Sequence, residues 1–253
     1  MREPPLLKTI RKKAVSHVLS IFALPMNYIS HYFLDSRLEQ PYYDLGLAWP
    51  DLMGNFHRAW KPLRRAGLPF ENTEGRHLWE GVQAHLDADA LFHNSDFFRE
   101  QSHDIRIRME QQGLGGRGPR LFFLAHISLE VLLDRLIIVN YPGVADRFYT
   151  DLFSVDEESV ASELRNAVNP DYGHFFEMFH RFRQSRYLYA YAEADKMLYA
   201  MNRIMGRAKQ NLLDENLHER LKTALLLSEE ALSKVYLDFF EWMQARLARL
   251  RKP

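Results

Sequence analysis

The sequence of 253 residues contains no cysteine, and this absence limits the chemistry available to it. Disulfides, thiolate metal sites and cysteine nucleophiles are excluded, and secretion gains no support. A transition metal would have to be bound by histidine and carboxylate side chains. The 11 histidines of the chain provide enough candidates for such a site.

A net charge is absent as well, because 33 Lys and Arg residues balance 33 Asp and Glu residues. This balance gives no overall field that would attract nucleic acid, so we expect no nucleic-acid partner. No apolar run reaches the roughly 20 residues that a membrane-spanning helix needs. We expect a cytoplasmic protein in which any membrane association is confined to the first 25 residues.

The N-terminal region has a pattern of its own. Basic residues between positions 8 and 13 precede an apolar run over residues 14–24. The order resembles the start of a signal peptide, but the run contains His17 and two serines, and no small-residue cleavage site follows. A basic amphipathic helix is an equal alternative. We expect an N-terminal extension over residues 1–25 and one domain over residues 26–253.

Helical periodicity runs through nearly the whole sequence, whereas the alternating pattern of strands is scarce. The sequence predicts helices over residues 26–38, 76–93, 95–112, 120–140, 154–166 and 216–252, and one or two helices over residues 175–213. Ser154 is expected to cap the helix that it begins. Residues 41–50 are expected to be turn-rich, with a bend at Gly46 and a short helix beginning near Pro50. The pattern indicates an all-α fold, a single-domain helical bundle.

Two of these segments each carry a histidine and a carboxylate four residues apart. His85 and Asp89 lie in the first segment, and His126 and Glu130 lie in the second. A spacing of four places both side chains on one face of a helix. Imidazole and carboxylate together are typical ligands of Zn, Mn or Fe. Two such pairs on facing helices indicate a metal site inside a bundle.

The second pair gives the stronger signal. His126, Glu130 and Asp134 interrupt a helix that is apolar on nearly every side, and such a helix is usually buried. Buried carboxylates are costly unless they are paired or bound to a metal. The alternative is a structural salt-bridge network with Arg135 or another cation. For the first pair, the alternative is a solvated stripe of ordinary side-chain pairs.

Two further residues would complete a ligand set. His31 is polar within apolar surroundings, where a lone histidine is more often a satisfied core residue. Asp51 follows Trp49 and Pro50 at the expected helix start, where it could simply cap the helix. The set of nitrogen and oxygen ligands matches a mononuclear or dinuclear hydrolytic site. Its members are His31, Asp51, His85, Asp89, His126 and Glu130.

Four segments resemble the bacterial acyl carrier protein phosphodiesterase family. Residues 26–31, MNYISH, resemble the M-N-[FY]-[LI]-A-H opening of that family. Residues 46–51 resemble its G-N-L-L-x-D segment, and residues 81–89 resemble its G-[IV]-x-x-H-x-x-I-D segment. Residues 125–133 resemble its L-D-V-x-x-D-H-F-L helix. The resemblance extends from these motifs into the later helical segments, nearly to the C-terminus.

The resemblance implies a fold similar to HD-domain metal phosphohydrolases, with histidine and carboxylate ligands around a divalent cation. It implies manganese first, with Fe, Zn and Mg as alternatives. The implied reaction cleaves the phosphodiester between 4′-phosphopantetheine and the serine of holo-acyl carrier protein. That carrier is acidic, so a basic cluster would become its docking face. The cluster consists of Arg58, Lys61, Arg64 and Arg65, with Arg76 nearby.

Within this resemblance, the six candidate ligands would hold one or two ions, and a metal would lower the pKa of a bound water that attacks phosphorus. We expect Asp51 to be the most sensitive residue, because it would bind metal or orient that water. Arg207 would neutralise the phosphate. His93, Asp134 and Asp195 are candidates for supporting groups behind the ligands.

Three positions depart from the family pattern. Gln83 stands where the family can have a second histidine, His126 replaces an aspartate, and Glu130 is longer than the aspartate of the family. These residues keep the ability to coordinate but bear on metal choice and substrate. Zinc-dependent phospholipase C-like proteins also have helical H-x3-[DE] pairs, and residues 46–51 partly resemble their G-x3-P-D segment. The alternative from another class is a non-catalytic helical binding protein.

Overall fold

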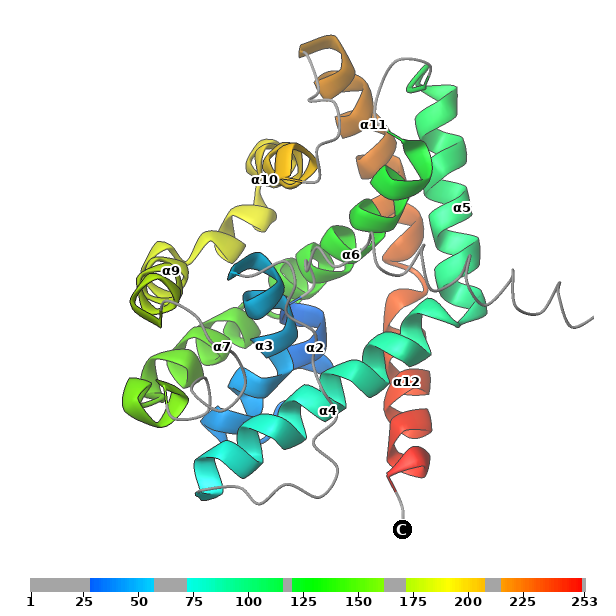
Figure 1. Cartoon of the computed structure of the whole chain (residues 1–253). Helices are drawn as coiled ribbons and strands as arrows, with labels where there is room; N and C mark the ends of the chain where they lie inside the picture. Colours follow the sequence, from blue (N-terminus) through cyan, green and yellow to red (C-terminus); the bar gives the residue numbers. More distant parts are fainter. Residues whose placement is uncertain (1–27, 57–71, 116–119, 162–171, 208–214, 252–253) are drawn as a thin grey trace, which may run out of the picture.

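The computed structural model describes residues 28–56, 72–115, 120–161, 172–207 and 215–251 (Figure 1). No strand occurs among these residues. One large hydrophobic cluster contains residues from Tyr28 to Leu247, and a small second cluster joins α3 to α4, so the all-α single-domain helical bundle predicted from the sequence is confirmed. The elements are α2 (Tyr28–Asp35), α3 (Pro41–Phe56), α4 (Thr73–His93), α5 (Asp96–Gln111), α6 (Leu121–Asn140), α7 (Pro142–Ser154), α9 (Tyr172–Ser185), η1 (Tyr187–Ala192), α10 (Ala194–Arg207), α11 (Glu215–Leu232) and α12 (Tyr236–Leu250).

Helix α6 is the central element of the bundle. It is buried almost continuously from Phe123 to Ile138, and it packs against α2, α5, α7, α10, α11 and η1. Each large aliphatic side chain that leaves water contributes roughly 1.5–3 kcal/mol, so α6 supplies much of the apolar stabilisation. Pro142 begins α7 directly after it, which ends α6 where the sequence predicted. The polar residues of α6 therefore lie in the core.

The expected turn-rich stretch before residue 50 is wrong, because these residues belong to α3. Pro41 begins the helix, at a position where no intrahelical N–H is needed. Pro50 lies inside the helix. A proline there cannot donate the intrahelical hydrogen bond, and its ring crowds the carbonyl of the preceding turn. Tertiary packing against α4 has therefore outweighed the local turn signals of this segment.

Two glycines make that packing close. A Cβ atom on Gly46 of α3 would collide with the carbonyl oxygen of Leu78 and lie 2.8 Å from the Cα of Gly81 in α4. A Cβ atom on Gly81 would likewise collide with the carbonyl oxygen of Tyr43. Gly46 therefore serves a backbone-to-backbone contact of two helices, and the expected bend at this residue does not occur.

Other boundaries also differ from the expectations. Ser154 ends α7, and the N–H of Ser159 bonds instead to the carboxylate of Asp156, which begins the next turn. The segment expected as a final long helix is divided between α11 and α12, because bonds such as that from Val235 N–H to the Leu232 carbonyl tighten the turn between them. After α9, Arg186 has a φ of 45°, which ends the helix and redirects the chain into η1.

The expected extension over residues 1–25 lies outside the described residues, as do Arg58, Lys61, Arg64 and Arg65 of the basic cluster. Arg76 is described and lies exposed near Glu80 on α4. Among the described helices, none combines the length and the apolar character that crossing a bilayer would require.

Candidate metal centre

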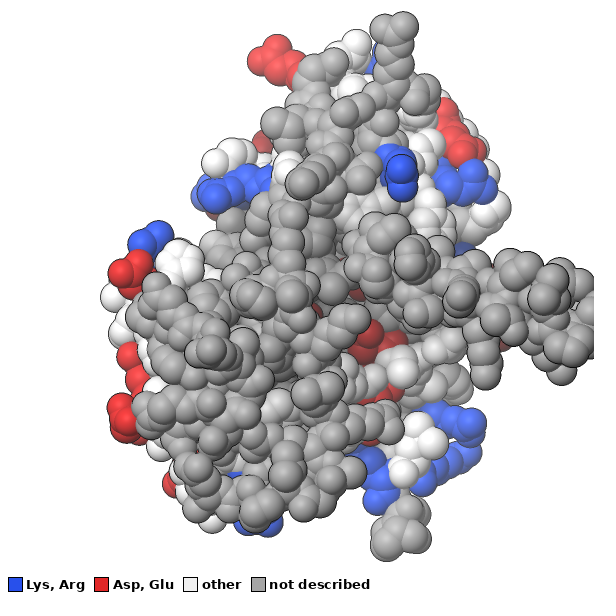
Figure 2. All heavy atoms as spheres, viewed as in Figure 1, with Lys and Arg blue, Asp and Glu red and all other residues white. Residues whose placement is uncertain are grey.

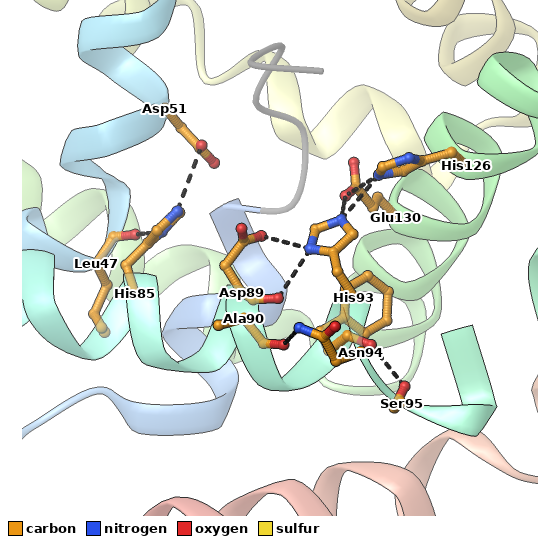
Figure 3. Close-up of polar contacts among 11 residues, drawn as sticks. Leu47, Asp51, His85, Asp89, Ala90, His93, Asn94, Ser95, His126 and Glu130 are labelled. Carbon is orange, nitrogen blue, oxygen red and sulfur yellow. Dashed lines mark hydrogen bonds and ion pairs between the residues drawn. The ribbon is translucent and has the colours of Figure 1, made fainter. Parts of the chain in front are cut away.

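The six predicted ligands come from four helices that meet in the core of the bundle. His31 lies on α2, Asp51 on α3, and the two pairs lie on α4 and α6. The structure brings them into two neighbouring groups of side chains, and Figure 3 labels all of them except His31. The first cluster consists of His31, Asp51, His85 and Asp89. The second cluster consists of His93, His126 and Glu130.

In the first cluster, the contact between α3 and α4 fixes the orientation of His85. Its Nδ1 lies 2.8 Å from the carbonyl oxygen of Leu47, an arrangement that assigns the proton to Nδ1. Nε2 is then free of hydrogen and lies 3.8 Å from Asp51 Oδ1. The ring of His31 stacks on that of His85 with 3.9 Å between centroids. One donor atom each from His31, His85 and Asp89 falls within 4.8 Å of the others.

Several buried atoms of the first cluster have no hydrogen-bond partner among the described residues. They are both ring nitrogens of His31 and Oδ2 of Asp51. Burial, followed by the nearby His85, holds the pKa of His31 well below its ordinary value. Burial raises the pKa of Asp51 well above its ordinary value, and neighbouring carboxylates add to the effect. Unpaired buried groups are costly, and a divalent cation would satisfy Asp51 Oδ2 and the His31 ring nitrogen that carries no proton.

The second cluster has the dimensions of a coordination sphere. His93 Nε2 lies 3.0 Å from His126 Nε2 and 3.3 Å from Glu130 Oε1, and the last two atoms are 3.0 Å apart. Ligands about 2.1 Å from a metal are separated by about 3.0 Å at a right angle and about 3.4 Å at a tetrahedral angle. The three atoms therefore form one face of a sphere into which a transition metal fits.

The charges of the second cluster also favour a cation. Burial alone would raise the pKa of Glu130, but the charge and hydrogen bond of His126, with the bond from His93, lower it to about 2. Burial would lower the pKa of His93, but its hydrogen bonds to Asp89 and Glu130 outweigh burial and raise it to about 11. Without a metal, a proton on His93 supplies the positive charge that these carboxylates attract.

His93 connects the two clusters. Its Nδ1 lies 2.9 Å from the backbone carbonyl of Asp89 and 3.1 Å from Oδ1 of the same residue, whereas Nε2 points at the second cluster. The sequence predicts that His93 lies behind the metal ligands and supports them. In the structure, His93 lies among the potential ligands themselves. The signal was present, because His93 follows Asp89 by the same four residues that separate Asp89 from His85.

No lysine or arginine of the described residues forms an ion pair with a carboxylate of either cluster. Arg135, the cation proposed for a structural network on α6, instead bonds to Glu229 at 2.9 Å and to the carbonyl of Tyr191 at 2.5 Å. The salt-bridge alternative with Arg135 is therefore wrong. The positive charge that the clusters lack has to come from protons or from a metal.

The other predicted residues have different surroundings. Asp134 accepts hydrogen bonds from Ile29 N–H at 3.3 Å and from Ser30 N–H at 2.7 Å and Oγ–H at 2.6 Å, so it anchors the start of α2 and positions the helix of His31. Asp195 is exposed on α10, where it pairs with Lys222 at 2.5 Å. Arg207 is the last residue of α10, and its side chain lies outside the described part of the structure.

The donor set of imidazole and carboxylate suits Mn, Fe or Zn, whereas Mg²⁺ prefers oxygen ligands and retained waters. Because the atoms that lack partners are buried and of the right chemistry, the residues fit a divalent transition metal. No protein-family model, no curated protein and no solved structure matches this chain.

Proposed function

We propose that this protein is a metal-dependent phosphodiesterase whose two clusters hold divalent ions, manganese first among them. The observation that carries the proposal is the buried, unpartnered Asp51 Oδ2 and His31 ring beside the triangle of donor atoms in the second cluster. A purely structural polar network would be expected to satisfy its own buried atoms. This network instead leaves Asp51 Oδ2 and the His31 ring without partners among the described residues, beside carboxylates that attract positive charge.

The residues have separable tasks in such a reaction. When bound, a divalent ion supplies Lewis acidity toward the phosphate and makes an attacking water more acidic. The carbonyl of Leu47 holds the proton of His85 on Nδ1, so that Nε2 remains available as a ligand. Asp51 Oδ2 has no donor among the described residues, so it can accept a hydrogen bond from the attacking water and orient it.

We propose the 4′-phosphopantetheine phosphodiester of holo-acyl carrier protein as the substrate. The four segments that resemble acyl carrier protein phosphodiesterases each contribute to the clusters. They supply His31 from residues 26–31, Asp51 from residues 46–51, the first pair from residues 81–89 and the second pair from residues 125–133. This coincidence of motif and site supports the substrate beyond the general chemistry of phosphodiesters.

The test is hydrolysis by the full chain loaded with Mn²⁺, Fe²⁺ or Zn²⁺ in turn. Mass spectrometry of holo-acyl carrier protein should show conversion to the apo form. Asp51→Ala should reduce the rate by about 10³-fold or more while the thermal transition stays cooperative, because the variant removes a group at the reacting atoms. Asp96→Ala is the matched control, since this side chain is 79% exposed on α5.

Two outcomes would contradict the proposal. Full activity in Asp51→Ala would remove the assigned site. A protein that binds none of the three metals, and gains no stability from them, would favour a non-catalytic helical binding protein. Hydrolysis of phosphatidylcholine or bis(4-nitrophenyl) phosphate, without action on the carrier protein, would retain the reaction and change the substrate to that of a phospholipase C-like enzyme.

A further inference from the structure

A cavity of about 570 Å³ lies among α9, η1 and α10, on the side of the bundle formed by the yellow and orange helices in Figure 1. This volume is within the roughly 300–1,000 Å³ of ligand pockets in proteins. Its wall is mainly aromatic and aliphatic and includes Phe182, Tyr187, Tyr191 and Ile204. A cavity of this size and character accommodates an apolar group much larger than a water molecule.

The cavity shares two helices with the first cluster. Tyr28 lines the cavity and lies on α2 one turn before His31. Leu52 also lines it and follows Asp51 directly on α3. A molecule in the cavity would therefore lie against the same helices that hold the candidate metal ligands. This position is appropriate for the non-reacting part of a substrate.

The charged residues of the cavity wall are all cationic. They are Arg181, Lys196 and Arg203, and no Asp or Glu of the described residues lines the cavity. Arg181 is paired with Glu177 at 3.3 Å and Lys196 with Glu193 at 2.7 Å, whereas Arg203 has no ion-pair partner among the described residues. Basic side chains are visible over α10 in Figure 2. An anion at this rim would meet Arg203 without displacing an ion-pair partner among the described residues.

The wall argues against a nucleotide. Recognition of a base edge needs donors and acceptors in fixed positions, which Asn, Gln, Asp or Glu side chains usually provide. In the part of the chain that the structure describes, none of these side chains lines the cavity, and the polar groups of its wall are the three cations, Ser185 and tyrosine hydroxyls. An apolar interior with an unpaired cation at its edge is suited instead to a flexible aliphatic chain that ends in an anion.

We propose that the cavity is a subsite for an unbranched acyl chain attached to a phosphate ester, with Arg203 binding the phosphate. As a substrate subsite it rests on the proposed phosphodiesterase activity, and it extends the substrates to esters that carry an acyl chain, which the holo carrier protein lacks. As a binding site it is independent of hydrolysis. Arg203 precedes by one turn of α10 the residue for which the sequence predicts phosphate binding, Arg207.

The test measures binding of hexyl, decyl and dodecyl phosphate, below their micellar concentrations, to the metal-free full chain by calorimetry. The affinity should rise about threefold to fourfold for each added methylene, because each one leaves water. Inorganic phosphate and adenosine monophosphate should bind at least about 100-fold more weakly than dodecyl phosphate. Equal affinity along the series, or preferential binding of the nucleotide, would overturn the proposal.

Two variants with matched controls locate the site. Ala200→Trp places an indole in the cavity and should abolish binding of dodecyl phosphate, whereas Ala245→Trp on the exposed face of α12 should leave it unchanged. Arg203→Gln should weaken binding about tenfold or more, whereas Arg249→Gln should not. If Ala200→Trp fails to fold, the Arg203 variant still decides. Unchanged affinity in Arg203→Gln would overturn the assigned anion contact.

Two sources of the chain can be distinguished with the same assay. Lysophosphatidic acid carries its acyl chain close to the phosphate, whereas acyl-phosphopantetheine separates the two by the pantetheine arm. Tighter binding of the first would identify a lipid as the source of the aliphatic chain, and tighter binding of the second would identify the carrier-protein arm. Binding without hydrolysis would leave the subsite intact and reject the proposed function, whereas hydrolysis without chain-dependent binding would reject only the subsite.

Discussion

The two clusters differ in how many of their buried polar atoms have hydrogen-bond partners, although α4 contributes residues to both. In the first cluster, both ring nitrogens of His31 and Oδ2 of Asp51 have no partner among the described residues. In the second cluster, the facing atoms of His93, His126 and Glu130 are within 3.3 Å of one another. A proton can therefore stand in for a metal in the second cluster. The first cluster has no such substitute, so a bound ion should relieve it most.

The clusters also differ in what holds them together. The first depends on the close approach of α3 to α4 at Gly46 and Gly81. The second spans α4 and the buried α6, whose position is fixed by side chains along its whole length. The first should therefore be the more sensitive of the two to changes at a distance from its ligands.

The largest expected effect is that of Gly81→Ala, which would break the first cluster and spare the second. The added Cβ collides with the backbone of α3, so the helices must separate at a cost of about 3 kcal/mol or more. Urea unfolding would measure the loss. The control is Gly143→Ala on α7, where the nearest atom to a new Cβ is 3.9 Å away, so little loss is expected. Equal stability of the two variants would contradict the backbone contact.

Metal addition is expected to have the next largest effect. Mn²⁺ at about 100 times its dissociation constant should stabilise the metal-free chain by about 2.7 kcal/mol.

Without metal, Asp51→Asn should cost little or nothing, because burial already disfavours the charge of Asp51. Glu130→Gln should be destabilising without metal, because it weakens the bonds to His93 and His126. Calorimetric scans of both variants would check this, and a larger cost for Asp51→Asn would reverse the comparison.

Asp134→Ala should have an intermediate effect and should act on the first cluster through α2. It removes the acceptor of the N–H groups of Ile29 and Ser30, at a cost of about 1–3 kcal/mol. Metal affinity should fall with it, because His31 lies on the freed helix. Asp134→Asn retains an acceptor and should recover part of both losses. Loss of stability without any change in metal affinity would show that the position of α2 does not affect metal binding.

The smallest expected effect is a pH dependence at the start of α3. Burial raises the pKa of Asp44 to about 7, although the N–H of Arg37 donates to it. The unfolded chain loses this proton near pH 4, so the folded state holds it longer and stability falls as pH rises from about 4 to about 7. The charges of Asp151 and Asp35 add to the burial, and that of Arg37 opposes it.

Asp44→Asn removes this proton equilibrium and keeps an oxygen acceptor for Arg37. The difference in unfolding free energy between pH 5 and pH 7 should shrink by about 1 kcal/mol. Urea titrations at the two values would measure it, with the exposed Asp96→Asn as the control. An unchanged slope would show that Asp44 titrates normally in the folded chain.

The sequence anticipated most helices and the residues on them, because four-residue spacing is a local property. It identified His85, Asp89, His126 and Glu130 from that spacing alone. It could not show that His93 faces α6, since this depends on where two distant helices pack. The prolines and the glycine of α3 are local turn signals, and they led to the wrong prediction of a turn. Packing against α4, which lies later in the sequence, makes this segment helical, and a local pattern does not contain that contact.

Helix α2 is only eight residues long, yet it lies between two sites. Tyr28 forms part of the cavity wall, His31 belongs to the first cluster, and Asp134 fixes the start of the helix. A short helix moves as one body, so an aliphatic ligand in the cavity that displaced Tyr28 would displace His31 as well. Thermodynamic reciprocity would then apply. The factor by which the bound ligand changes metal affinity would equal the factor by which bound metal changes affinity for the ligand.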